Sequence, residues 1–405
     1  MEYDVKTFKK IDDIDSEDWD SVSSTIFTKH ACLKEIEKLT RIKITPRYIA
    51  VLKNEKIVAT TALYIEEDAE YFTIEESIFG KYHKFLKPFS LGLNPCLIGH
   101  IPIGTIFKSI EVDTTINAQE KIYQLIINSM EKIAKEEGIY QYGFLCIMED
   151  EQILRKVLQE NKFVEKFSSF AVYMDIVWES FKDYLYSFKR KQRNTIKWEF
   201  ARQKKKGIIT SHSLTLGDNK EEMIKLFNEN FYKYQKRESK TNSEFIHGIY
   251  NKLENNIGLV IDKKDDKIVS CDMYFKWEDT ISLFKVGQNY KLSEGSASLF
   301  NVSIYEPLKI AIKEGYSRIY NGSGAYQYKL LRGAKLKPMY IYVKSSSRIK
   351  QAFLRLVFPL LSHIKLIKHQ RLSFQKKSQK RHNLIPKRFS GVLVSFAAAI
   401  KKICK

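Results

Sequence analysis

Apolar and polar residues follow two different periods along the chain, and together they predict an alternating order of strands and helices. Short apolar runs on both sides of polar turns predict two strand–turn–strand pairs. Apolar residues at helical spacing predict two long amphipathic helices, each ended by a glycine suited to a left-handed cap and followed by a short strand. The strand pairs are 47–52 with 57–65 and 258–262 with 268–277, the helices are 120–137 and 297–314, and the short strands are 140–147 and 317–321.

The same order of elements occurs twice, which predicts two similar α/β halves. The sequence KIAKEEG that ends at Gly138 corresponds to KIAIKEG that ends at Gly315. The first half carries roughly 35 additional residues within 66–117, more than an ordinary connection contains. We expect this insertion to shape a cleft or to lengthen the strands. We also expect Pro307 to kink the helix of the second half.

Two basic segments lie outside these halves. One of them has apolar residues at helical spacing among lysines and arginines, and it predicts a single long helix that Gly207 ends. Beyond Lys344 two further amphipathic helices are predicted, the second after Pro386. The predicted domains are a first domain 1–177, a basic connecting helix 178–207, a second domain 208–345 that contains the expected site, and a basic helical tail 346–405.

The net charge of +20 is concentrated in the connector and the tail. Residues 345–405 contain fifteen lysines and arginines and no aspartate or glutamate, and residues 182–207 have a net charge of +8. The rest of the chain therefore has a net charge of about −3. A basic amphipathic tail without carboxylates fits an anionic membrane surface. It fits nucleic acid less well, because few aromatic residues are present to stack on bases. The alternative is a helical cap on the second domain.

The composition is that of a folded protein from a reducing compartment. A hydrophobic fraction of 44%, with 25 phenylalanines and 23 tyrosines, provides for sizeable cores. The five cysteines are scattered and have no metal-ligand spacing, so neither a disulfide framework nor a metal site is predicted. No uncharged apolar run approaches the ~20 residues that span a bilayer. We expect a cytoplasmic protein that can lie on the inner face of the membrane.

Two glycine-containing segments of the second half are candidates for ligand binding. Ser293-Glu-Gly-Ser-Ala297 opens a predicted helix, where backbone amides and the helix dipole favour an anion. Gly322-Ser-Gly324 follows a predicted strand and allows the backbone to approach a ligand closely. A plain strand-to-helix turn is the alternative for the second segment.

The order of elements in each half, together with this helix start, resembles the GNAT acyltransferase fold. The GNAT pattern is Arg/Gln-x-x-Gly-x-Gly/Ala, which Gly295 and Ala297 fit, whereas Leu292 occupies the Arg/Gln position. The resemblance implies that the pyrophosphate of coenzyme A binds at Gly295, Ser296, Ala297 and Ser298.

Three further segments are similar to the tandem-GNAT, Fem-like group of acyltransferases and peptidoglycan-type aminoacyltransferases. They are Lys189–Asn194, Ile304–Gly315 and Tyr328-Lys-Leu-Leu-Arg-Gly-Ala334. The resemblance implies two tandem GNAT-like domains, each with a mixed, mostly antiparallel sheet and flanking helices. The long coiled-coil arm of many Fem enzymes is not found in the sequence, which makes tRNA the less favoured partner.

The resemblance also implies an acyltransferase, with three readings of its activity. The first is direct transfer of an acyl group from an acyl-CoA-like thioester to an amine, or less favourably a hydroxyl, of a sugar, amino acid or cell-envelope precursor. The second is amide formation that depends on aminoacyl-tRNA. The third is a non-catalytic, membrane-associated scaffold, which Leu292 keeps open. Acyl-CoA or aminoacyl-tRNA would be a co-substrate, and no permanently bound cofactor is expected.

Lys329 is the first candidate for catalysis, because a fixed positive charge suits a phosphate or a developing anion. A solvated helix lysine is the alternative. Asp272 lies in an apolar strand and is either a general base with a raised pKa or a carboxylate on an exposed strand face. The other candidates are Tyr328 for catalysis, Tyr320 as a proton carrier, and Arg190, Arg193, Ser323 and Tyr326 for substrate binding. For the two arginines a solvated helix face is the alternative.

Overall fold

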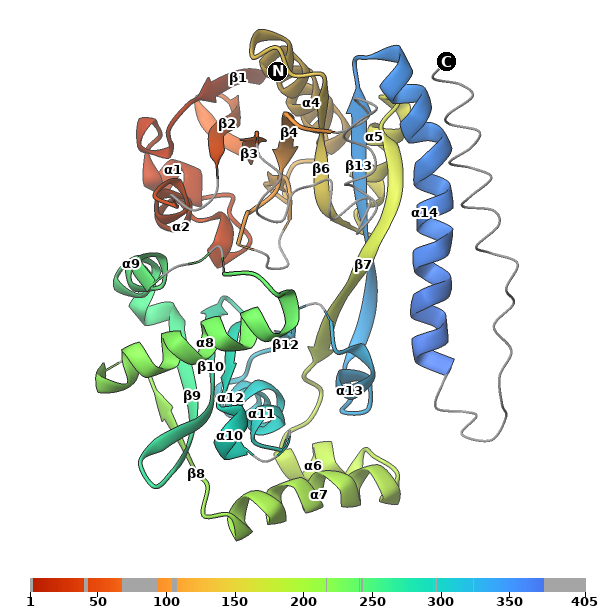
Figure 1. The fold of residues 1–405 in the computed structure, drawn as a ribbon. Coiled ribbons are helices and arrows are strands. Elements are labelled where there is room, and N and C mark those ends of the chain that lie inside the picture. The colour runs from red at the N-terminus through yellow and green to blue at the C-terminus, as the bar shows by residue number, and fades with distance from the viewer. Residues whose placement is uncertain are drawn as a thin grey trace.

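Figure 1 shows the computed structural model of the chain. The residues that it describes are 3–39, 43–67, 93–103, 108–215, 217–239, 241, 243–293, 295, 297–322 and 324–374. The strands are β1 Tyr3–Phe8, β2 Ile44–Lys53, β3 Lys56–Glu66, β4 Cys96–Gly99, β5 Glu111–Val112, β6 Gln141–Met148, β7 Val164–Asp175, β8 Ile209–Ser213, β9 Ile257–Lys264, β10 Lys267–Trp277, β11 Thr280–Gln288, β12 Arg318–Tyr320 and β13 Lys335–Ser345.

Helices flank the strands in both halves. The helices are α1 Ser16–Asp20, α2 His30–Glu37, α4 Gln119–Glu136, α5 Gln152–Glu160, α6 Phe181–Tyr186, α7 Arg190–Lys205, α8 Lys220–Gln235, α9 Ser243–Leu253, α10 Tyr290–Ser293, α11 Ala297–Phe300, α12 Glu306–Glu314, α13 Tyr326–Leu330 and α14 Arg348–Phe374. The predicted strand pairs are confirmed as β2 with β3 and β9 with β10. The predicted helix of the first half is confirmed as α4.

One mixed sheet runs through the described part of both halves. Its strand order is β1-β2-β3-β4-β6-β13-β7-β12-β11-β10-β9-β8, and β5 pairs with β3. Among the strand pairs of the described residues, β4 with β6 and β11 with β12 are parallel, and the others are antiparallel. The predicted α/β class, with mostly antiparallel strands and flanking helices, is thereby confirmed.

The long helix predicted over 297–314 is interrupted. A π-helical turn, Asn301–Tyr305, lies between α11 and α12. Pro307 stands at the start of α12 and has no N–H to donate to the preceding turn, so the irregularity falls just before it. The turn matters for function because Ser303 and Ile304 line the cavity described below.

The connector is two helices, and the prediction of one long helix was wrong. Helix α6 ends at Tyr186, and α7 begins after Lys189, which has an extended backbone with φ −60° and ψ 150°. The hydroxyl of Ser187 donates to the carbonyl of Tyr184 at 2.7 Å and so satisfies an acceptor at the helix end. Tyr184 is buried and its hydroxyl donates to the carbonyl of Arg332 at 3.0 Å. This anchor fixes the short helix against the second half.

Strand β13 of the second half lies between two strands of the first half. It pairs with β7 over Lys335–Val343 and with β6 over Met339–Ser345. The C-terminal end of β7 pairs with β12. Figure 1 shows β7 and β13 passing side by side from one half to the other. The two halves are therefore joined by backbone hydrogen bonds as well as by the connector.

A shared hydrophobic core adds to this connection. Trp19, Phe27 and Leu33 of the first half belong to the same buried cluster as Phe227 and Phe275 of the second. The rings of Phe27 and Phe275 lie 5.0 Å apart at an interplanar angle of 80°. Edge-to-face pairs of this kind add to the free energy gained from burial. This core holds Phe27 at the wall of the cavity in the second half.

Gly143 is expected to be essential for the pairing of β6 with β13. A Cβ at this position would lie 2.0 Å from the carbonyl oxygen of Tyr342 on the neighbouring strand. Gly143→Ala should therefore lower the free energy of unfolding by about 3 kcal/mol, at the upper end of the cost of overpacking. Gly138→Ala is the matched control, because a Cβ there would meet no atom within 4 Å and only its φ of +67° is unfavourable. Urea unfolding should show a loss of about 1 kcal/mol for the control. Equal losses for the two variants would contradict the prediction.

Helix α14 follows β13 and covers one face of the sheet beside β7 (Figure 1). Leu354, Val357 and Phe358 pack with Leu93 and Ile98 in a separate buried cluster. No helix in the described part of the chain has the length and apolar character needed to cross a membrane. The second tail helix predicted after Pro386 and much of the predicted insertion lie outside the described residues.

Candidate active site

The parallel strands β11 and β12 separate after a short pairing, and a cavity opens where they part. Their pairing covers only Thr280–Ser282 and Arg318–Tyr320. Beyond it β11 continues along β10, whereas the chain after β12 turns away at Gly322 and Gly324, whose φ angles are +68° and +92°. The cavity has a volume of about 730 Å³, and residues of α8, β10, β11, α11 and α13 line it together with Phe27.

Hydrogen bonds between described residues cross the corresponding place in the first half. The hydroxyl of Ser109 donates to the carbonyl of Leu145, and its own carbonyl accepts from the hydroxyl of Thr61 at 2.7 Å. The space that remains beside these residues has a volume of only about 10 Å³. In the described part of the chain, the second half thus holds the open cavity at its parallel strand pair.

Lys329 and Asp272 both line this cavity. The ammonium of Lys329 donates to the carbonyl oxygen of Asn321 at 2.5 Å. Burial lowers the pKa of Lys329 to about 8, while the nearby charge of Asp272 acts in the opposite direction. Asp272 is 2% exposed, and burial raises the pKa of its carboxyl group well above the usual range, with Lys329 opposing the shift. Asp272 is therefore not an exposed strand carboxylate, and Lys329 is partly buried in the cavity wall and not fully solvated.

Two oxygen atoms of the cavity wall have no hydrogen-bond partner among the described residues. They are Oδ1 of Asp272 and Oδ1 of Asn321, both buried. Buried polar atoms in folded proteins nearly always have a partner, because an unpaired one costs the free energy of desolvation. Asp272 and Asn321 both line the cavity, so each contributes an acceptor beside it that the described residues leave without a donor.

Sequence reasoning missed Lys285 and the polar rim contributed by α8. Lys285 lines the cavity, and burial lowers the pKa of its ammonium to about 8. Its Nζ lies 5.3 Å from the centre of the ring of Phe284. Asn230 of α8 donates to the carbonyl of Val286 at 2.9 Å and accepts from the hydroxyl of Tyr290 at 2.5 Å. The signal in the sequence was a lysine within an otherwise uncharged strand.

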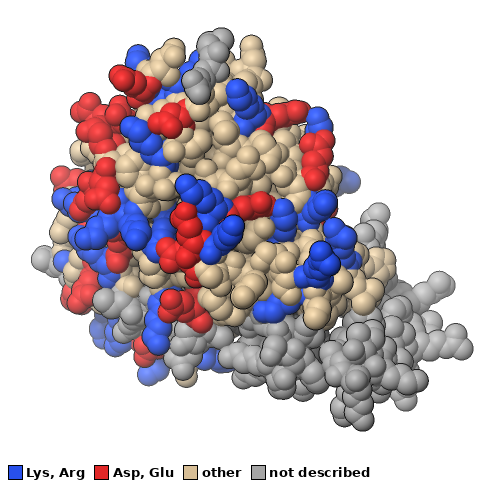
Figure 2. All heavy atoms as spheres, turned by 90° about the horizontal axis from the view of Figure 1, so that it is seen from above, with Lys and Arg blue, Asp and Glu red and all other residues tan. Residues whose placement is uncertain are grey.

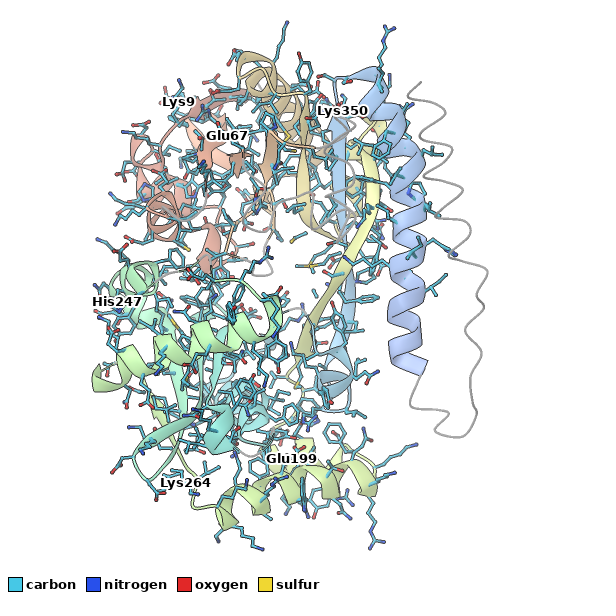
Figure 3. The ribbon with its side chains drawn as sticks, in the orientation of Figure 1. Lys9, Glu67, Glu199, His247, Lys264 and Lys350 are labelled. Atoms are coloured by element: carbon cyan, nitrogen blue, oxygen red, sulfur yellow. The ribbon has the colours of Figure 1, made fainter. Side chains whose placement is uncertain are left out.

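A buried ionic network holds the segment that carries Lys329. Arg332 forms a salt bridge with Glu199 of α7, which Figure 3 labels, and both side chains are buried. The Nε of Arg332 donates to the hydroxyl of Tyr305 at 2.7 Å, and one of its terminal nitrogens donates to the carbonyl of Tyr328 at 2.9 Å. The network fixes the turn after α13 against the connector and the π-helical turn.

Tyr328 stands at the mouth of the cavity. It is 54% exposed, and its ring centre lies 5.6 Å from that of Phe300. Tyr326 lies away from the cavity lining, and its hydroxyl accepts from the backbone N–H of Phe170 at 3.4 Å. Ser296 and Ser323 lie outside the described residues.

The two arginines of the connector are not brought to Lys329. Arg190 lines a separate groove of about 710 Å³ along the outer face of α7, next to the exposed Trp198. Arg193 donates to the carbonyl of Phe188 at 3.3 Å, and its guanidinium lies 4.9 Å from the ring centre of Tyr186. Neither arginine lines the cavity. Their predicted role in substrate binding stays a prediction.

Comparison with known families decides the relationship of this chain. A family model described as FemAB-like, peptidoglycan biosynthesis/recognition, matches residues 10–358. The chain belongs to the FemAB-like family. The predicted relation to the Fem-like group is thereby confirmed. No curated protein matches the chain by sequence.

Several solved structures are similar to this chain. The crystal structure of FemX has 12% sequence identity and a TM-score of 0.56, over 83% of this chain and 96% of that chain. The structure of L-PGS from Bacillus licheniformis has 10% identity and a TM-score of 0.49, over 82% and 92% of the two chains. A tandem GNAT protein from the clavulanic acid biosynthesis pathway has 7% identity and a TM-score of 0.48, over 85% and 99%. Only the first of these scores exceeds 0.5, and it supports the predicted tandem GNAT-like fold.

In this FemAB-like chain, the helix start that the sequence predicts to bind an anion has Leu292 where the GNAT pattern has Arg or Gln. Gly295 has a φ of +129°, and its carbonyl accepts from the side chain of Gln288 at 2.8 Å. A Cβ at Gly295 would lie 3.5 Å from a terminal nitrogen of Arg202 on α7. A guanidinium of α7 therefore lies beside Gly295, whereas Leu292, at the Arg/Gln position of the GNAT pattern, carries no charge. Ala297 begins α11, and the hydroxyl of the next residue, Ser298, is buried and donates to Oδ2 of Asp262 at 2.7 Å.

Proposed function

We propose that the protein is a GNAT-type transferase that moves an acyl group from an acyl-CoA-like thioester to an amine in the cavity between β11 and β12. The observation that carries this proposal is that Lys329 lines one cavity together with two unpaired acceptor atoms, Oδ1 of Asp272 and Oδ1 of Asn321. Membership of a family described by peptidoglycan biosynthesis/recognition supports an acceptor from the cell envelope.

The chemistry of the cavity wall suits attack by an amine. As the amine nitrogen bonds to the acyl carbon, the carbonyl oxygen gains negative charge and the nitrogen must lose a proton. Asp272, when ionised, accepts that proton. The ammonium of Lys329 stabilises the negative charge on the oxygen, and then on the thiolate that leaves when the C–S bond breaks. The reaction needs no covalent bond to the enzyme, because the cavity brings donor and acceptor together.

An amine fits the cavity better than a hydroxyl does. A primary amine has more than one N–H, so in the proposed complex one N–H donates to Asp272 and a second donates to Asn321. A hydroxyl has one donor hydrogen and would leave one of the two buried oxygens unpaired. This difference supports N-acylation over O-acylation.

Amide formation from aminoacyl-tRNA is the second candidate function. The groove along α7 supports it, because Arg190 and Lys191 lie there beside Trp198, which is 57% exposed. Cations follow a phosphate backbone, and an exposed indole can stack on a base. In this candidate the leaving group is the ribose oxygen of the tRNA, and the roles of Lys329 and Asp272 are unchanged.

Thermal unfolding in the presence of each donor should separate the two candidates. A donor that binds the native state at about a hundred times its Kd stabilises that state by about 2.7 kcal/mol. We expect this stabilisation from acetyl-CoA or a longer acyl-CoA, and none from deacylated tRNA. The variant Ser303→Trp, whose larger side chain fills the cavity, should no longer be stabilised by acyl-CoA. Stabilisation by aminoacyl-tRNA alone would favour the second candidate. The absence of stabilisation by every donor would contradict both and leave a non-catalytic scaffold.

A further inference from the structure

The outward face of α14 combines exposed apolar side chains with cations and has no carboxylate. Its exposed residues recur every three or four positions and so share one face of the helix. Ile349 is 77% exposed, Leu356 56% and Ile364 41%. The exposed residues, where side chains of α14 are described, are Arg348, Ile349, Ala352, Arg355, Leu356, Pro359, His363 and Ile364.

The opposite face holds the helix firmly on the sheet. Leu354 and Phe358 are fully buried there. The hydroxyl of Ser362 accepts from the backbone N–H of Phe167 at 2.9 Å. At the start of the helix, the side chain of Gln351 donates to the carbonyl of Lys162 at 2.8 Å. The apolar side chains of the outward face are therefore presented by a docked helix.

A basic cleft borders this face at the start of α14. It has a volume of about 830 Å³, and Leu356 of the outward face forms part of its wall. The cations that line it are Lys162, Lys344, Arg348 and Arg355, and no lining residue is acidic. One of these lysines, Lys344, is paired with Glu131 at 2.5 Å. By contrast, acidic and basic side chains are interspersed elsewhere on the end of the molecule where α14 begins (Figure 2).

We propose that the outward face of α14 docks on an anionic lipid surface. Ile349, Leu356 and Ile364 would enter the headgroup region, while Arg348 and Arg355 bind lipid phosphates at the cleft. The proposal does not rest on the transferase function, because none of these residues lines the cavity of Lys329.

Charge favours lipid over the other occupants of this face. In a symmetric contact with a second copy, Arg348 and Arg355 would meet the same outward face, which offers no carboxylate to either arginine. The chain's own segment 375–405 contains no acidic residue either, so it would place more cations against them. Among the described side chains of α14, the outward face exposes no phenylalanine, tyrosine or tryptophan, so only the imidazole of His363 could stack on a base. Lipid phosphate supplies the missing negative charge.

Co-sedimentation of the full chain with lipid vesicles tests the proposal. We expect binding to vesicles of phosphatidylcholine with about one third phosphatidylglycerol, and little binding to phosphatidylcholine alone. Arg348→Gln with Arg355→Gln should weaken binding by more than about tenfold, since each cation near an anionic surface contributes about fivefold. Ile349→Ser with Leu356→Ser should weaken it by about tenfold, also at raised ionic strength, because the loss is apolar.

Control variants carry comparable substitutions on other surfaces. Ile209→Ser removes an apolar residue that is 73% exposed on β8. Lys264→Gln with Lys267→Gln removes two cations from the β9–β10 turn; Figure 3 labels Lys264 at the end of the molecule away from Lys350 of α14. Both controls should bind vesicles as the wild type does.

Four outcomes would overturn the proposal. They are wild-type binding by both α14 double variants, failure of the wild type to bind anionic vesicles, a dimer in analytical ultracentrifugation that the Ile349→Ser/Leu356→Ser variant no longer forms, and tRNA binding that is lost in the arginine double variant. Circular dichroism of each variant checks that it remains folded. Acyl transfer to a soluble acceptor should be unchanged, so loss of vesicle binding is distinguishable from failure of the proposed function.

Discussion

Lys329→Met is expected to lower kcat by about 100- to 1000-fold, because it removes the cation that faces the developing negative charge. The ammonium is held in place by the carbonyl of Asn321 and lies near Asp272 in the cavity. Methionine keeps the length and apolar stem of the side chain and removes only the charge and its donors. Turnover of an acyl donor with a primary amine acceptor, measured at saturation, is the readout.

The same substitution should not destabilise the protein. The pKa of Lys329 is lowered from its ordinary 10.5 to about 8 by burial. The folded state therefore binds this proton less tightly than the unfolded state, and the wild type carries a penalty below about pH 8 that disappears as the pH rises toward 10.5. The penalty is no more than about 3 kcal/mol. Lys329→Met should lack this pH-dependent rise in the free energy of unfolding.

Lys335→Met is the matched control for this experiment. Lys335 begins β13, and its side chain is 59% exposed where it meets Asp175. An exposed pair of this kind contributes little free energy, so neither turnover nor unfolding should change much. Unchanged turnover in Lys329→Met would remove Lys329 from the chemistry. An equal loss in both lysine variants would point to a general effect of charge.

The pH dependence of turnover in the wild type gives a second test of the roles of Asp272 and Lys329. Turnover requires Asp272 ionised and Lys329 protonated, so the rate should rise with pH as Asp272 loses its proton and fall above about pH 8 as Lys329 loses its own. The alkaline limb should be absent from the residual activity of Lys329→Met. A limb that persists in the variant would assign it to another group.

The features that could be predicted from the sequence depend on nearby residues, and those that were missed depend on contacts between distant segments. The two strand pairs and α4 follow from local periodicity, and Lys329 follows from a short motif around Tyr328–Ala334. The proximity of Lys329 to Asp272 depends on how α13 and β10 are placed in the folded chain, which local periodicity does not encode. Strand β13 enters the first half beside β6 although about 190 residues separate them in the chain. Its place in the sheet could not be read from the sequence for the same reason.

The helix start at Gly295 is a second place where a local motif could not predict a contact from a distant segment. Leu292 occupies the place of the expected Arg or Gln, and taken alone it argues against an anion site. In the structure, Arg202 reaches Gly295 from α7, about 90 residues earlier in the chain. A charge supplied by a distant segment cannot be recognised from a motif of consecutive residues.

Arg332→Met is expected to lower the free energy of unfolding by about 3–5 kcal/mol, because it leaves the carboxylate of Glu199 buried without a counter-ion. Arg332 also donates to Tyr305 and Tyr328, so the variant leaves several acceptors unpaired. Glu199→Met should cost a similar amount, since it leaves the guanidinium of Arg332 buried without a counter-ion. Urea unfolding of each variant provides the measurement.

The double variant distinguishes the cost of leaving one buried ion unpaired from the net contribution of the Glu199–Arg332 salt bridge to stability. Replacing both buried ions with apolar residues of similar size is often neutral, so Glu199→Met with Arg332→Met should recover most of the lost stability. Arg318 and Asp175 give a matched control, because their salt bridge at 2.6 Å is 34% and 24% exposed, and Arg318→Met should cost only about 1 kcal/mol or less. If the double variant loses as much as the two single variants together, the network does not act as a unit.

The network also predicts that the double variant keeps its stability but loses part of its turnover. Arg332 holds the carbonyl of Tyr328, one residue before Lys329, so the double variant should fold yet position the ammonium less accurately. We expect it to lose about tenfold in kcat at wild-type stability, with the alkaline limb of its pH profile retained. Arg332 is in this view a positioning residue, because it acts on the reacting atoms only through the segment that carries Lys329. Full turnover in the stable double variant would show that the cavity keeps its geometry without the ionic network.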